Sequence, residues 1–132
     1  MSFPIDTDIC SAYLRRPSKL ASRIQQYYGR LHLSAITVGE LRVWALRKSA
    51  PPTRIKDLDA LLRVVVVLGV TLPVADRFGA LRAAQLDSGL PMPQLDLLIA
   101  ATALEHQLIV VTHNTRHFAA IPGLQLVDWL AP

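Results

Sequence analysis

The chain has 132 residues, 52% of them hydrophobic, which predicts a single domain, residues 1–132, with a core of its own. No run of about 18 uncharged apolar residues is present, so we expect no membrane span, and the N-terminus lacks the pattern of a secretory signal. The single cysteine, Cys10, excludes an internal disulfide and fits a reducing cytoplasm.

The net charge of +4 is concentrated in the first half of the chain. Residues 1–63 hold 11 Lys and Arg against 5 Asp and Glu, whereas residues 64–132 hold 3 against 5. A basic surface of this kind attracts phosphate groups, and Arg15, Arg16 and Lys19 are the candidate contacts. Ordinary solvated helix faces explain the same charges equally well.

Taken in chain order, the hydrophobic pattern alternates short strands with helices. The predicted strands are 3–5, 31–36, 66–72, 108–111 and 124–127. The predicted helices are 9–14, 18–28, 37–48, 53–65, 75–86 and 95–106, with a helical turn at 116–119. The alternation indicates an α/β fold with a mostly parallel central sheet of four to five strands and helices on both faces.

Four polar residues fall on one edge of this predicted sheet. Asp6 ends the first strand, and Glu40 lies in the first turn of the helix after the second. Asp96 lies in the first turn of the helix before the fourth strand, and Asn114 follows that strand. Ligands of open parallel sheets bind at the carboxyl edge of the strands. The sequence therefore predicts a shared site there.

Each of these acids also has a local explanation. Asp6 or Asp8 can cap the helix that follows it, Thr37 and Glu40 match a capping box, and Asp96 suits the positive end of its helix. None of these roles explains why the acids share one edge. Clustered carboxylates repel unless a cation lies among them, and oxygen ligands favour Mg²⁺ or Mn²⁺. Such a cleft on a basic protein suits phosphodiester hydrolysis.

The same segments resemble a known family. The matching pieces are IDTDICSAYL at 5–14, LSAITVGEL at 33–41, LDLLIAATALEHQLIVVTHNTRHF at 95–118 and GLQLVDW at 123–129. Together they resemble PIN-domain ribonucleases of the VapC-like toxin type. The resemblance implies a three-layer sandwich and a cytoplasmic, commonly dimeric, divalent-metal endoribonuclease acting on structured RNA. It also implies a cognate antitoxin that occupies the cleft. The family's acids fall on Asp6, Glu40 and Asp96, with a variable fourth position at Asn114.

The chain departs from the family pattern at three positions. Asp8 stands where the motif usually has asparagine, Asn114 is a neutral amide where PIN domains often have an acid, and His117 lies at a variable position. The number of metal ions bound is the property these departures affect most. Thr7 and Thr112 can support the acids or a phosphate through their hydroxyl groups, or serve only as turn residues.

Two other function classes compete with this hypothesis. The segment Ile5-Asp6-Thr7-Asp8 resembles the DxD start of a haloacid-dehalogenase-type phosphatase, but lysines stop at Lys56 and the required late pair of acids is missing. A PIN-like module that binds RNA or protein without cutting is the second alternative. Metal-dependent RNA cleavage that is lost with Asp96→Asn separates the enzyme from that module.

Overall fold

Within residues 2–15 and 20–131, which the computed structural model describes, five short strands form one parallel sheet. These strands are β1 (Phe3–Pro4), β2 (Leu31–Ser34), β3 (Val66–Leu68), β4 (Ile109–Val111) and β5 (Gln125–Val127). β2 pairs with both β1 and β3, and β4 pairs with β5. A parallel bridge between Ile5 and Val111 joins the two groups, so the strand order is β3-β2-β1-β4-β5.

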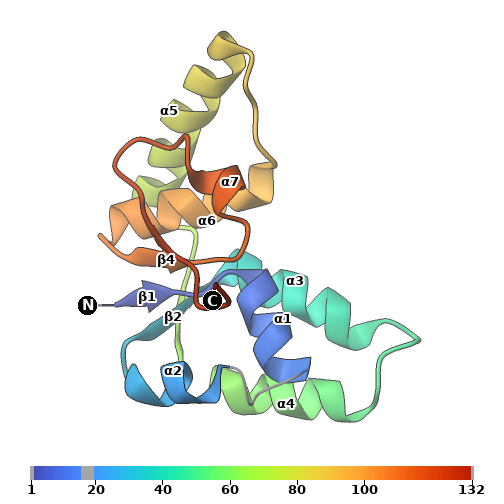
Figure 1. Ribbon diagram of the computed structural model, residues 1–132. Helices are drawn as coiled ribbons and strands as arrows, with labels where there is room; N and C mark the ends of the chain where they lie inside the picture. Colours follow the sequence, from blue (N-terminus) through green and yellow to red (C-terminus); the bar gives the residue numbers. More distant parts are fainter. Residues whose placement is uncertain (1, 16–19, 132) are drawn as a thin grey trace.

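Helices cover both faces of this sheet (Figure 1). They are α1 (Thr7–Arg15), α2 (Ala21–Gln26), α3 (Ala35–Leu46), α4 (Thr53–Leu62), α5 (Leu72–Ser88), α6 (Gln94–Glu105) and α7 (Thr115–Phe118). Figure 1 shows α5 and α6 on one side of the strands and α2 and α4 on the other. The predicted α/β three-layer architecture is confirmed.

The core is divided between the two faces because each layer of helices packs its own apolar side chains. Ile5, Leu33 and Leu58 belong to the larger cluster, under α1 to α4. Leu97 and Phe118 belong to the smaller one, under α5 to α7. Helix α6 is apolar nearly all round, as predicted, and its side chains from residues 99 to 103 are all buried. A buried helix holds its first turn, and therefore Asp96, in a fixed place.

The start of α3 differs from the prediction. The capping box at Thr37 and Glu40 is wrong, because Ser34 is the N-cap residue and its Oγ accepts a hydrogen bond from Ile36 N (3.1 Å). Thr37 instead lies inside the first turn, where it is fully buried. Its Oγ1 has no hydrogen-bond partner among the described residues. Glu40 is therefore free of a capping role.

The third strand is also shorter than predicted. Thr71 caps α5 through a hydrogen bond from Val74 N to Thr71 Oγ1 (3.4 Å), so the helix begins at Leu72 where the sequence suggested strand. Pro73 lies in the first turn of this helix, a position that tolerates proline. Gly89 ends α5 in the left-handed conformation (φ 72°), which glycine adopts without strain.

Some predictions fall on residues outside the described ranges. These are the start of the second helix at Ser18 and two of the candidate phosphate contacts, Arg16 and Lys19. Over the parts of the chain that are described, no helix is both long and apolar enough to cross a membrane.

Candidate active site

The predicted acids lie where the strand order reverses. β1 connects through α1 and α2 to β2 on one side of it, whereas its neighbour on the other side, β4, comes much later in the chain. Open parallel sheets form a crevice outside the carboxyl ends of the two strands at such a point. Asp6 follows β1 and Thr112 follows β4, so both lie at this crevice.

Asp6 is the most buried acid of the site, with 4% of its surface exposed. Its Oδ1 accepts a hydrogen bond from Thr7 N (2.8 Å), and its Oδ2 accepts one from the Thr112 hydroxyl (2.9 Å). Burial, followed by the negative charge of Asp8, raises the pKa of Asp6 from 3.8 to about 6. The charge of Asp96 adds to this rise, and the two hydrogen bonds oppose it.

Glu40 reaches the site through Thr7. The Thr7 hydroxyl donates to Glu40 Oε1 (2.5 Å), while its backbone N–H donates to Asp6. One residue at the start of α1 therefore holds two carboxylates that lie 34 positions apart in the chain. Thr7 thus contacts two acids directly, as the sequence analysis allowed alongside a purely structural turn role.

Asp96 enters the site from the first turn of α6. Its Oδ2 lies 3.1 Å from His117 Nδ1, on α7. The side chain of Asp96 is 20% exposed and that of His117 is 46% exposed, so this pair lies at the solvent side of the crevice. The structure thus brings Asp96 close enough to Asp6 for their charges to interact, with His117 beside it.

Asp8 and Asn114 meet in an arrangement that their sequence positions did not suggest. The backbone N–H groups of His113 and Asn114 both donate to Asp8 Oδ2 (3.0 and 3.2 Å), and Ile9 N donates to Asp8 Oδ1 (2.7 Å). Burial raises the pKa of Asp8 and these hydrogen bonds oppose the rise. Asn114 contacts Asp8 through its backbone N–H, while the residue as a whole is exposed.

One pair of site residues was missed from the sequence. Asp128 Oδ2 lies 2.9 Å from His113 Nδ1, and Asp128 Oδ1 accepts a hydrogen bond from Leu130 N (2.8 Å). Asp128 follows β5 directly, as Asp6 follows β1. Its position after a predicted strand is the same sequence signal that pointed to Asp6.

Hydrogen bonds link Asp6 to Glu40 through Thr7 and to Asp8 through Thr112 and Asn114 N, whereas Asp96 contacts His117. Across residues 2–15 and 20–131, no three or more His, Cys, Asp or Glu side chains are grouped as a ready metal-binding cluster. Glu40 accepts a hydrogen bond from Thr7, and Asp96 contacts His117.

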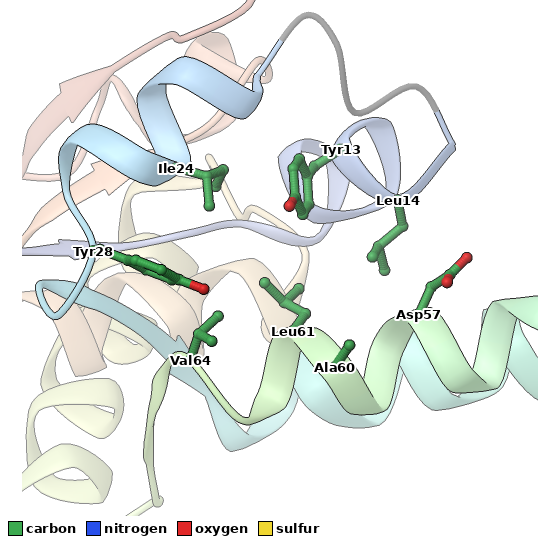
Figure 2. A pocket seen from close by; sticks show the side chains of 8 residues that line it. All are labelled: Tyr13, Leu14, Ile24, Tyr28, Asp57, Ala60, Leu61 and Val64. Carbon is green, nitrogen blue, oxygen red and sulfur yellow. The ribbon is translucent and has the colours of Figure 1, made fainter.

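Away from the crevice, a hollow of about 310 Å³ lies between α1, α2 and α4 (Figure 2). Its walls are mostly apolar, with the carboxylate of Asp57 and the hydroxyl groups of Tyr13 and Tyr28 at its edges. Tyr28 is 57% exposed. Arg15, the candidate phosphate contact that is described, is exposed at the last residue of α1, the end away from Asp6.

The crevice, the parallel sheet and the strand-end acids define a class of protein. A model of the PIN domain matches residues 4–124, and the chain belongs to this family. It is 30% identical over 130 residues to the tRNA(fMet)-specific endonuclease VapC of Salmonella typhimurium, covering 98% of both chains. It is equally identical, over 131 residues, to ribonuclease VapC2 of Haemophilus influenzae, covering 98% of this chain and 99% of the relative.

Solved structures agree with these relatives. The chain superposes on the DNA-bound VapBC of Salmonella typhimurium with a TM-score of 0.91 at 30% identity, covering 98% of each chain. For VapBC-1 of nontypeable Haemophilus influenzae the TM-score is 0.84 at 28% identity, covering 99% of this chain and 100% of that one. The resemblance to VapC-like PIN-domain ribonucleases is confirmed, and the chain is a nuclease. This family membership excludes the haloacid-dehalogenase alternative.

Proposed function

We propose that this nuclease is the toxin of a toxin–antitoxin pair and hydrolyses phosphodiester bonds in structured RNA with Mg²⁺ or Mn²⁺. We further propose that it does so as a single domain in the cytoplasm. The observation that supports this most strongly is the environment of Asp6, a nearly buried acid at the switch point of the sheet, whose pKa is raised by burial and then by the charges of Asp8 and Asp96. PIN-domain nucleases are generally dependent on a divalent metal.

The donor set fits a hard cation. Asp6, Glu40 and Asp96 offer only oxygen atoms, as Mg²⁺ and Mn²⁺ prefer. Burial and then the charge of Asp8 raise the pKa of Asp6, the charge of Asp96 adds to that rise, and a cation beside Asp6 would favour its ionised form. We propose Asp6, Glu40 and Asp96 as the catalytic ligands, with the side-chain oxygen of Asn114 as a fourth candidate. A bound ion would supply an activated water molecule and neutralise charge on the phosphate.

The remaining polar groups orient these acids. Thr7 donates to both Asp6 and Glu40, Thr112 donates to Asp6, and His117 contacts Asp96. Groups that hydrogen-bond to metal ligands fix their direction and typically change metal affinity or activity by about 10–100-fold. We assign Thr7, Thr112 and His117 this supporting role.

The substrate and partners follow from charge and exposed apolar surface. We propose that Arg15, Arg16 and Lys19 contact RNA phosphates. Second, we propose a cognate antitoxin, since the solved relatives are VapBC complexes. The apolar hollow of Figure 2 is the candidate contact. Helix α1 runs nine residues from Thr7, next to Asp6, to Arg15 beside the hollow. At about 1.5 Å per helical residue, a partner bound at the hollow would lie within roughly 13 Å of the acids.

A homodimer is the third proposed assembly. Strand β3 is the edge of the sheet, and its Val66 and Val67 are 50% and 46% exposed. On α3, which packs against β3, Val43 and Leu46 are 62% and 69% exposed. Exposed apolar residues on neighbouring elements are candidates for an interaction surface. We propose that a second copy of the chain covers this surface.

Cleavage of a structured RNA tests the central proposal. The purified protein should cut a transfer RNA with Mg²⁺ or Mn²⁺ and not with EDTA, and Asp96→Asn should lose at least about 100-fold of the rate. Asp76→Asn, which removes the same charge from an exposed position on α5, should cleave like wild type. A correctly folded wild type that binds RNA without metal-dependent cleavage would favour the non-catalytic module instead.

A further inference from the structure

We propose that Asp8 is a positioning residue whose carboxylate clamps the turn between β4 and α7 and thereby holds the Thr112 hydroxyl on Asp6. The proposal rests on the proposed function only in taking Asp6 to be catalytic. The sequence suggested simply an extra acid beside Asp6, and the geometry points to a more specific task.

The clamp joins distant parts of the chain. Asp8 Oδ1 accepts from Ile9 N in its own helix, and Asp8 Oδ2 accepts from the N–H groups of His113 and Asn114. Two successive backbone N–H groups therefore point at one carboxylate oxygen. The result fixes the first turn of α1 to the segment that leaves β4, the two elements on either side of the crevice.

The effect on Asp6 passes through one hydroxyl group. Asn114 N also donates to Thr112 Oγ1 (3.0 Å), and the Thr112 hydroxyl donates to Asp6 Oδ2 (2.9 Å). A hydroxyl has a single hydrogen, so accepting from Asn114 N leaves that hydrogen for Asp6. If Asp8 releases the turn, Asn114 N moves and the Thr112 hydrogen loses its fixed direction.

The number of donors favours a carboxylate over an amide in this chain. Three N–H groups approach Asp8 from two sides, and both of its oxygens are used. An asparagine has one oxygen and one NH₂ group, so its NH₂ group would face at least one of these N–H donors and could not accept from it. Asp8→Asn should keep part of the clamp and Asp8→Ala none. A role through charge alone, including direct metal ligation by the anion, would make the two variants equally poor.

Amide hydrogen exchange measured by NMR in EDTA tests the clamp without any catalysis. The amide protons of His113 and Asn114 should exchange about 10-fold faster in Asp8→Asn and faster still in Asp8→Ala, because their opening becomes local. Asp76→Asn should leave both rates unchanged. Asp8→Asn is nearly isosteric and keeps the test available if Asp8→Ala fails to fold. Unchanged exchange at both amides would overturn the clamp.

Steady-state kinetics then test its consequence for Asp6. For RNA cleavage, kcat should fall about 10–100-fold in Asp8→Ala and by less in Asp8→Asn, with KM unchanged. An equal loss in the two variants would assign Asp8 a role through its charge and overturn the positioning role. A wild type that does not cleave RNA would remove the proposed function, while the exchange rates would still decide the clamp.

Discussion

At the scale of single residues, the site depends on the burial of Asp6. An acid with 4% of its surface exposed keeps little hydration when it ionises, so it holds its proton longer than an acid in water. The hydrogen bonds from Thr7 and Thr112 compensate for part of the lost hydration and lower the pKa of Asp6. Neighbouring Asp8 and Asp96 make ionisation harder, and this is the arrangement in which a cation is most strongly favoured.

This burial predicts the pH dependence of stability in EDTA. Between pH 3.8 and about pH 6, the folded protein retains a proton on Asp6 that the unfolded chain has lost. The free energy of unfolding therefore falls as pH rises through this window, by up to about 3 kcal/mol. Asp6→Asn should flatten the fall, which urea unfolding at pH 4.5 and 7 would measure. Equal pH dependence in wild type and variant would remove Asp6 as the cause.

At the scale of elements, alternation of strands and helices could be predicted from the sequence, but element ends could not. Ser34 and Thr37 are both good cap residues, and Glu40 favoured Thr37 through the capping box. Ser34 caps the helix because β2 ends there. Thr71 caps α5 in the same way, inside a run of apolar residues that resembled a longer strand. Which residue caps each helix depends on tertiary packing, which the local sequence pattern does not show.

The cap assignment predicts opposite effects of two substitutions in α3. Ser34→Ala should lower the free energy of unfolding by about 1 kcal/mol, because Ile36 N loses its acceptor. Thr37→Val should cost little or stabilise, since it removes a buried hydroxyl that has no partner among the described residues. Urea denaturation measures both. A larger loss at Thr37 than at Ser34 would restore the capping box.

The site itself was predictable in part for a similar reason. From the pattern alone, Asp6 after a strand and Glu40 and Asp96 near the starts of helices could be placed at one edge of a parallel sheet; that the three form one site stays a prediction. Their partners could not be placed, because hydrogen bonds such as Thr7 to Glu40 and Asp8 to the turn at 113–114 join segments 33 to 106 positions apart. Side-chain direction at those distances is set by packing.

At the scale of the whole molecule, the proposal assigns RNA binding to basic residues of the first half and metal binding to the acids of the crevice. If Arg15, Arg16 and Lys19 bind phosphates, the logarithm of RNA affinity should fall with the logarithm of salt concentration by about 0.7–0.9 per phosphate neutralised. Replacing all three with alanine should flatten that slope, as measured by fluorescence anisotropy with an inactive Asp96→Asn background. An unchanged slope would move the RNA-binding surface to other basic residues.

The most direct measurement of a shared metal site is the melting temperature in Mn²⁺ and in EDTA. Binding to the folded state alone adds about 2.7 kcal/mol at a hundredfold excess over Kd, so wild type should melt higher in millimolar Mn²⁺. Asp6→Asn, Glu40→Gln and Asp96→Asn should each lose most of that increase. In EDTA, Asp96→Asn should be as stable as wild type or more stable, because one of several opposed charges is gone. If Asp96→Asn is destabilised in EDTA and still gains the full increase with Mn²⁺, Asp96 serves only its helix end and the shared site is contradicted.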